Sequence, residues 1–275
     1  MTTFTPVESV TRTALLGLRL WDAVAGAAVS DGIQATEVSS GRRAVANTVD
    51  VLAFHDLPGL RASSYGNPST GFWSSPPAAR TFTFQVVDTN QRFLPFRFTT
   101  TVPQDGLYVA PCADPGATAT PLSSSPARPT IPAFAAIRAD LWDVVNDVPA
   151  AWAVLEVQGV GSAPWRGVAD SAGRALLLCP YPEPRWSGSS PPAGSQSLST
   201  QAWPITFSAQ YGPTATGPIG SPPPVPDICA VLTQPAATLL NSVSPDSPLL
   251  AQTLTFGREL ILRTGTQSVL LVLPS

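Results

Sequence analysis

The sequence contains no lysine and a single histidine, and these two absences exclude several kinds of active site. Without lysine, the chain has no Schiff-base lysine and no lysine to hold a nucleotide phosphate. The one histidine, His55, would have to serve any Ser-His-Asp or Cys-His arrangement, and no GxSxG segment is present. No glycine-rich phosphate loop follows an expected strand. We therefore expect no enzyme, no catalytic residues and no cofactor.

Charge of either sign is scarce. Charged residues make up 12% of the chain and the net charge is -3, whereas soluble domains carry about a quarter of charged residues. The fifteen arginines are scattered, and only Arg42 and Arg43 are adjacent, so a basic patch for nucleic acid is not expected. So weakly charged a surface is poorly protected against association. We expect other subunits to cover part of it, although a soluble monomer with neutral loops stays an alternative.

The cysteines and the N-terminus bear on the compartment. Cys112, Cys179 and Cys229 lie far apart and show no spacing typical of a metal site. Residues 1–10 lack the basic and apolar regions of a signal peptide. The apolar stretch 14–29 is interrupted by charges and is too short to span a bilayer. These features predict no transmembrane segment and a reducing interior, with the chain made in the cytoplasm.

The strongest positive signal is an internal repeat. Leu20-Trp21-Asp22 recurs 121 residues later as Leu141-Trp142-Asp143, and the segments that follow match in outline. A repeat of this length is typical of two copies of one small domain. The repeat therefore predicts an architecture, whereas nothing of comparable strength predicts an activity.

The periodicity of the apolar residues indicates strands throughout. Leu16, Leu18 and Leu20 alternate with other residues, and turn residues are frequent, with 31 prolines and 20 glycines. This pattern predicts an all-β fold of tandem β-sandwiches. The expected parts are an N-terminal arm (1–12), a first sandwich (13–109), a Pro-rich linker (110–133), a second sandwich with Pro-rich loops (134–226) and a C-terminal β extension (227–275).

The repeated Trp-Asp pair and the lone histidine have structural interpretations. An aspartate directly after a strand tryptophan is expected to accept backbone N–H bonds and fix the following turn. We expect Trp21 and Trp142 to be core anchors. His55 and Asp56 are adjacent on a strand, so their side chains point to opposite faces and are not expected to form an acid–base pair.

Four other tryptophans lie in or beside segments rich in Pro, Gly and Ser. Such loop aromatics can cover the ends of a sandwich, anchor a protein partner or stack on a sugar ring. All three interpretations stay open at this point. The candidate partner-contact residues are Trp73, Trp165, Trp186 and Trp203.

The close of the first repeat carries a family resemblance. The segment from Phe54 to Gly59, Phe-His-Asp-Leu-Pro-Gly, resembles the F-x-x-L-P-G close of transthyretin-like or carboxypeptidase-regulatory-like β-sandwiches. In the second repeat Tyr-Pro-Glu-Pro at 181–184 replaces Leu-Pro-Gly, so the resemblance is looser there. Modules of this family are non-catalytic scaffolds, which is what the resemblance implies for both repeats.

The whole layout is similar to a protein of phage-tail-like extracellular contractile injection systems. The segments that carry this resemblance are LRLWD (18–22), AFHDLPGL (53–60), FLPF (93–96), RADLWD (138–143), AWAVLEV (151–157) and TFGREL (255–260). The resemblance implies a non-catalytic structural subunit of the baseplate or a surrounding cage. Its partners would be other subunits of a particle that is assembled in the producing cell and can be released. The alternative is a carbohydrate- or surface-binding β-sandwich module.

Overall fold

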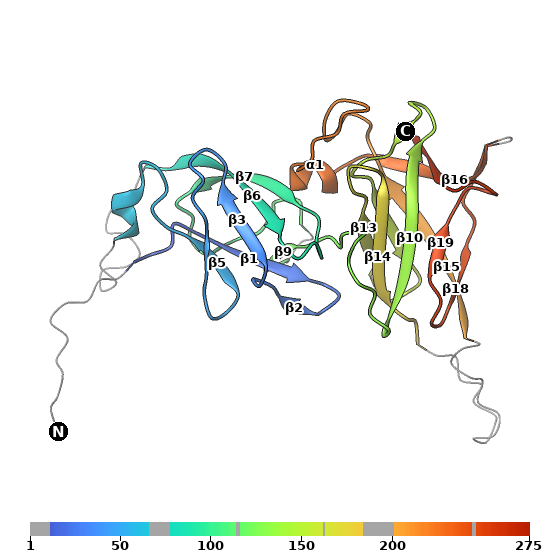
Figure 1. Cartoon of the computed structure of the whole chain (residues 1–275), viewed down its shortest axis with the longest axis horizontal. Coiled ribbons are helices and arrows are strands. Elements are labelled where there is room, and N and C mark those ends of the chain that lie inside the picture. Colours follow the sequence, from blue (N-terminus) through green and yellow to red (C-terminus); the bar gives the residue numbers. More distant parts are fainter. Residues whose placement is uncertain (1–11, 66–77, 114–115, 162, 184–200, 244–245) are drawn as a thin grey trace, which may run out of the picture. The chain divides into compact units, whose positions relative to one another are not determined.

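The fold is all-β, as the periodicity predicts. The computed structural model (Figure 1) describes residues 12–65, 78–113, 116–161, 163–183, 201–243 and 246–275. Nearly all of its regular structure is strand. The strands are β1 (Leu16–Asp22), β2 (Ala27–Ala28), β3 (Ile33–Glu37), β4 (Val45–Ala46), β5 (Val51–Phe54), β6 (Arg80–Asp88), β7 (Phe96–Val102), β8 (Leu107–Tyr108), β9 (Thr120–Pro121), β10 (Phe134–Asp143), β11 (Val148–Pro149), β12 (Val154–Gln158), β13 (Trp165–Val168), β14 (Arg174–Pro180), β15 (Ala202–Gln210), β16 (Ala236–Val243), β17 (Asp246–Pro248), β18 (Gln252–Thr255), β19 (Leu260–Leu262) and β20 (Leu270–Pro274). The helices are a 3-10 turn η1 (Arg61–Ser64) and α1 (Ile228–Leu232).

The chain divides into two compact units. The first comprises Met1–Thr89 with Arg97–Pro121, and the second comprises Asn90–Phe96 with Leu122–Ser275. Segments outside the expected sandwiches contribute strands to both units. The segment 110–133, expected as a linker, supplies β9 to the first unit. The segment 227–275, expected as an extension, supplies α1 and the strands from β16 to β20 to the second.

The first unit packs two sheets against each other. One sheet has the order β2-β1-β5-β4, with β8 and β9 paired to β1, and the other is β3-β6-β7. Its core contains a row of aromatic rings. Phe84 on β6 lies 4.6 Å from Phe54 on β5 and 5.1 Å from Phe98 on β7, measured between ring centroids. Because these rings join one sheet to the other and bury large apolar areas, they stabilise the sandwich.

The strand pairing of the second unit repeats that of the first. β1 is flanked by antiparallel β2 and β5 and by parallel β8 and β9. β10 is flanked in the same way by β11, β14, β19 and β20. Leu18 faces Tyr108 on β8, and Ala139, 121 residues after Leu18, faces Leu262 on β19. The C-terminal strands therefore complete the sheet around β10, as β8 and β9 complete the sheet around β1.

The two units differ in how their sheets close. In the second unit β16 pairs with both β15 and β20, so that eleven strands form one continuous sheet. In the first unit β7 pairs only with β6 within the described ranges, and the two sheets stay separate apart from a bridge between Thr36 on β3 and Arg43 just before β4. The core of the second unit lies inside the curled sheet, where Ile137, Leu141, Leu155 and Leu177 are buried.

The loop between β6 and β7 is longer than the sequence predicts. The turn residues Asp88-Thr89-Asn90-Gln91 between two apolar segments predict a hairpin with a four-residue connection, but β6 ends at Asp88 and β7 begins at Phe96. Phe93 instead forms a bridge with Ser124, and Leu94 N donates to Ser123 O at 2.9 Å. The segment 227–241 has the one pattern that predicts a helical turn, and α1 lies within it. The Asp227 carboxylate begins this helix by accepting hydrogen bonds from the backbone N of Cys229 and Ala230.

Candidate functional site

The repeated Trp-Asp pair forms a corner at the end of β10. Asp143 is buried, and its Oδ1 accepts hydrogen bonds from the backbone N of Val145 at 2.9 Å and of Asn146 at 3.1 Å. Its Oδ2 accepts a third from Asn146 Nδ2 at 2.8 Å. Tyr211 also hydrogen-bonds to this carboxylate, and its pKa is raised by burial first and by Asp143 second. The carboxylate therefore holds the turn between β10 and β11.

The first unit has the same corner at the end of β1. Asp22 is buried, and its Oδ1 accepts a hydrogen bond from Val24 N at 3.0 Å. The fourth residue after each aspartate has a left-handed backbone, with φ of 63° at Gly26 and 55° at Asp147. The prediction that both aspartates fix a turn is confirmed by these contacts.

The prediction that Trp21 and Trp142 are core anchors is wrong. Trp21 is 36% exposed and Trp142 is half-buried. Alternate side chains of a strand point to opposite faces, and Leu20 and Asp22 both point inward. Trp21 must therefore point outward, and Trp142 does so for the same reason. The repeat thus presents one tryptophan on the surface of each unit.

Beside Trp142 the surface of the second unit is hollowed. The depression has a volume of about 390 Å³ and is lined by Trp142, Val144, Asp147, Gln267, Val269 and Leu271. Trp142 and Leu271 are paired neighbours on β10 and β20. The indole Nε1 of Trp142 donates to Asp147 Oδ1 at 3.0 Å. Residues from two distant parts of the sequence are thereby brought together.

Removal of the Asp143 carboxylate is expected to destabilise the second unit. Asp143→Ala leaves the donors of Val145, Asn146 and Tyr211 without this acceptor, which should cost about 2–4 kcal/mol of unfolding free energy. Urea unfolding followed by circular dichroism measures the loss. Asp140→Ala, an exposed aspartate on the same strand, is the control and should change the unfolding free energy by less than about 0.5 kcal/mol. Equal losses in the two variants would contradict the assigned role.

The tryptophans predicted as partner contacts have different positions. Trp203 on β15 is 3% exposed, its Nε1 donates to Glu183 O at 3.2 Å, and its ring lies 5.9 Å from that of Tyr181. A ring so buried has almost no surface to offer to a partner, so Trp203 acts here as a core residue. Trp165 is half-buried and packs against the same core. Trp73 and Trp186 lie outside the described residues.

His55 and Asp56 have separate partners in the first unit. His55 Nδ1 lies 3.2 Å from Thr13 O. Asp56 forms an ion pair with Arg12, and its backbone N donates to Ser64 Oγ at 3.0 Å. Among the contacts of the described residues, the Asp56 carboxylate accepts no hydrogen bond from the His55 ring. These contacts hold the end of β5 against residues 12–13 and against η1.

The buried Glu37 is also accounted for by a turn. Burial raises its pKa, but hydrogen bonds from the hydroxyls and backbone N–H groups of Ser39 and Ser40 outweigh this effect, so that the pKa is lowered overall. A carboxylate that is saturated with local donors is held in its ionised form. Glu37 therefore stabilises the turn after β3.

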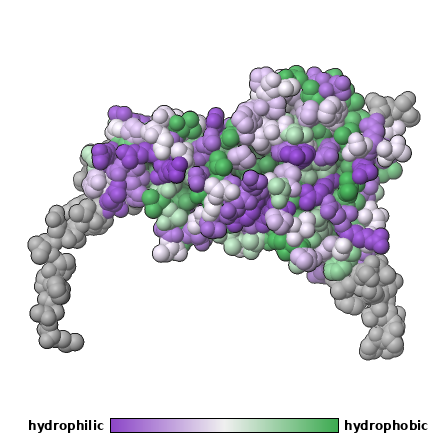
Figure 2. Space-filling view, viewed as in Figure 1, coloured by the Kyte–Doolittle hydropathy of each residue, from purple (hydrophilic) through white to green (hydrophobic). Residues whose placement is uncertain are grey.

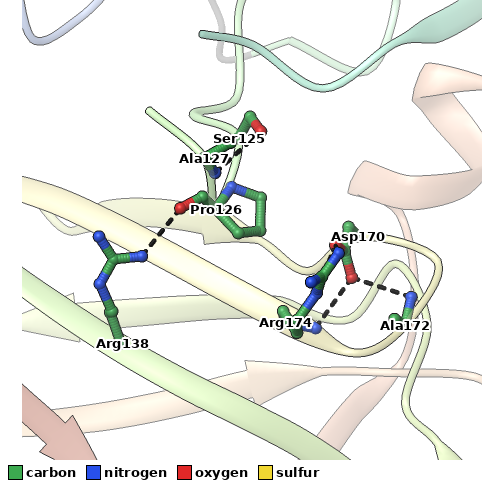
Figure 3. A network of polar contacts seen from close by, with 7 residues as sticks. All are labelled: Ser125, Pro126, Ala127, Arg138, Asp170, Ala172 and Arg174. Atoms are coloured by element: carbon green, nitrogen blue, oxygen red, sulfur yellow. Dashed lines mark hydrogen bonds and ion pairs between the residues drawn. The ribbon is translucent and has the colours of Figure 1, made fainter. Parts of the chain in front are cut away.

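Charged groups on the second unit hold loops in place (Figure 3). Arg138 Nη1 donates to Pro126 O at 2.8 Å, which ties the segment around Ser125 to β10. Asp170 Oδ1 accepts from the backbone N of Ala172 at 2.8 Å, and its Oδ2 accepts from Arg174 Nη2 at 2.7 Å. These arginines and this aspartate fix the turn before β14 and the entry to β10.

The remaining candidates for chemistry are thiols and metal ligands. Cys179 is free and buried, whereas Cys112 and Cys229 are disulfide-bonded, which the expected reducing interior does not predict. Among the residues that the structure describes, no group of three or more His, Cys, Asp or Glu side chains could hold a metal ion. Within the same ranges no helix has the length and apolar character needed to cross a membrane.

Comparison of the chain with protein-family models, with curated proteins and with solved structures finds no match in any of the three.

Proposed function

We propose that this chain is a non-catalytic structural subunit of a multi-protein assembly. The class of assembly that the sequence resemblance implies is a contractile injection system particle, at the baseplate or in a surrounding cage. The observation that carries the proposal is an apolar hairpin at a sheet edge of the first unit, formed by β4 and β5. The proposed mechanism is positional, because the two rigid β units would set a spacing while exposed edges dock on neighbouring subunits.

The β4–β5 hairpin exposes apolar side chains where a partner strand could add. β4 is the last strand of its sheet, and Arg43, just before it, bridges Thr36 on β3. Val45 on β4 is 64% exposed, and Val49 in the turn between β4 and β5 is 63% exposed. The hairpin is held in shape by Asn47, whose Oδ1 accepts from Val49 N at 3.0 Å and from Val51 N at 2.9 Å. An edge strand with exposed apolar side chains favours pairing with another chain.

The wider surface agrees with a docking role. Figure 2 shows apolar residues scattered among hydrophilic ones over the visible face. Other large apolar side chains are exposed in both units, including Val38 at 46%, Val145 at 63% and Leu250 at 68%. Single exposed apolar residues are ordinary in soluble proteins, so the β4–β5 hairpin and the low density of charge are the features that support a docking role.

The alternative function, a carbohydrate- or surface-binding module, was based on loop tryptophans. Of these, Trp165 packs on the core and Trp203 is buried. The described loop tryptophans therefore do not favour this alternative, and any support for it has to come from a different part of the surface.

The mass of the purified full chain in solution tests the proposal. Light scattering, on the chain alone and after mixing with the product of each adjacent gene, should show an oligomer or a stoichiometric complex. Val45→Glu combined with Val49→Glu should shift that species toward the monomer, because charge on an edge strand opposes pairing. Val145→Glu is the matched control, since Val145 is equally exposed in the second unit. A monomer that forms no complex at any concentration would refute the proposal.

A further inference from the structure

The depression beside Trp142 has the composition of a binding site for a small ligand. Its volume of about 390 Å³ lies within the range of about 300–1,000 Å³ that ligand pockets occupy. Most of its lining is apolar. Leu271 is buried, and Val144 and Val269 are half-buried beside the indole of Trp142. This lining gives a firm apolar surface with an aromatic ring.

Two planar polar groups accompany the apolar surface. Asp147 Oδ1 accepts a hydrogen bond from the Trp142 indole N–H, which fixes the ring, and Oδ2 receives no donor in the contacts observed within the described ranges. Gln267 is exposed, and its amide offers both donors and an acceptor. A ligand that rests on the indole would therefore meet hydrogen-bonding groups at the edge of the ring.

The comparison of the two units shows that the carboxylate is particular to the second. Asp147 stands where the first unit has Gly26, and both residues have a left-handed backbone. Glycine adopts this conformation without strain, and aspartate is among the few residues with a Cβ that adopt it readily. The turn itself does not need the aspartate, since the first unit forms the same turn with glycine. The side chain of Asp147 instead accepts a hydrogen bond from the Trp142 indole.

The charge and shape of the depression select among ligand classes. Asp147 is the only charged residue in the lining and no arginine is present, which disfavours anionic ligands such as phosphates or acidic sugars. Trp142 is the only aromatic residue in the lining, whereas recognition of quaternary ammonium ions uses cages of several rings. A neutral ring with an apolar face and hydroxyl groups at its edge matches both the indole and the two polar groups.

We propose that the depression beside Trp142 binds a neutral pyranose ring of a glycan. The C–H face of the sugar stacks on the indole. One hydroxyl donates to Asp147 Oδ2, and another exchanges a hydrogen bond with the amide of Gln267. The inference does not depend on the role in an assembly, because it concerns a different surface from the β4–β5 hairpin.

Titration calorimetry with the full chain tests this assignment. The probes are the methyl pyranosides of glucose, mannose, galactose and N-acetylglucosamine, with glucuronic acid and choline as anionic and cationic counterparts. At least one neutral pyranoside should bind more tightly than both counterparts. Trp142→Ala should weaken that binding by at least about tenfold. Trp21→Ala, which removes the equivalent exposed tryptophan of the first unit, should leave it unchanged.

A second variant separates a loss of sugar binding from a loss of folding. Asp147→Gly introduces the residue of the first unit at a left-handed position, so the turn should be kept, while sugar affinity should fall by about fivefold. Far-UV circular dichroism checks the fold of each variant. Binding of none of the four pyranosides, preference for choline, or unchanged affinity in Trp142→Ala would each overturn the proposal. None of these outcomes alters the expected mass in solution, so the two proposals fail separately.

Discussion

Replacement of Trp152 by alanine is expected to lower the unfolding free energy of the second unit by about 3–5 kcal/mol. Trp152 is 2% exposed and is among the largest fully buried side chains of the described residues. Its ring packs in an apolar cluster with Leu94, Val154, Val168 and Val231. Loss of the ring removes this contact area and leaves a cavity, because close-packed surroundings collapse only in part.

A hydrogen bond adds to the expected loss. Trp152 Nε1 donates to Pro223 O at 3.0 Å, which ties the Pro-rich loop after β15 to the body of the unit. The backbone O of Trp152 accepts from Gln234 Nε2 at 2.7 Å. The alanine variant keeps the second contact and loses the first, so Pro223 O must find water or stay unpaired.

Denaturant unfolding of three variants separates these contributions. Trp152→Phe keeps most of the ring but loses the N–H, and should cost less than Trp152→Ala. Trp142→Ala, which truncates a half-exposed tryptophan of the same unit, should change the unfolding free energy by less than about 1 kcal/mol. If Trp152→Ala were no more destabilising than Trp142→Ala, the cluster around Trp152 would not be a stabilising part of the unit.

The sequence could not have identified Trp152 as an anchor. The stretch 151–157 predicts a strand in which alternate residues share one face, but β12 begins only at Val154. Trp152 has a φ of 61°, a conformation that is rare for a bulky residue, and this conformation places its ring outside the alternation. Its partners Pro223 and Val231 lie more than 70 residues away, where no local pattern connects them.

Local periodicity did predict the strands that follow it. The alternation of Leu16, Leu18 and Leu20 gave β1, and the same alternation already implied that Trp21 faces outward. The general tendency of tryptophan to be buried led to the opposite, wrong expectation. A position in a strand decides which face a side chain occupies, and the tendency of the residue type only decides how much of it is covered.

Pairing between distant segments was beyond the sequence. β19 and β20 pair in parallel with β10. Parallel strands are not joined by a short hairpin turn, so no turn in the sequence indicates which strands pair. The same limit applies to the depression beside Trp142. The tryptophan could be found from the repeat, but Gln267 and Val269 are brought to it only by the pairing of β20 with β10.

Alkaline pH is expected to destabilise the second unit through the thiol of Cys179. Cys179 lies on β14 opposite Ala135 on β10 and is 0% exposed. Burial raises its pKa from 9.0 to about 12, because the thiolate would lose its hydration. The unfolded chain releases this proton near pH 9 and the folded chain retains it. Stability is therefore complete below pH 9 and falls as the pH rises toward 12.

The size of this loss follows from proton linkage. Between the two pKa values the unfolding free energy falls by about 1.4 kcal/mol per pH unit, to a total of about 4 kcal/mol. Tyr211 adds a loss of the same sign above its ordinary value of 10.0, because burial first and Asp143 second raise its pKa. Between pH 8 and pH 10 the thiol should dominate, since it is the first of the two groups to titrate in the unfolded chain.

Cys179→Ala removes the thiol and leaves Tyr211 in place. From pH 8 to pH 10 in urea unfolding, the variant should lose about 1.4 kcal/mol less stability than the wild type, whatever the constant cost of the substitution. Equal losses would mean that the thiol ionises as easily in the folded chain as in the unfolded one. A maleimide gives an independent reading, because Cys179 is the free cysteine and only an exposed thiolate reacts quickly. Labelling at pH 8 should be slow in the native chain and fast in urea, since the core of the second unit covers the thiol completely.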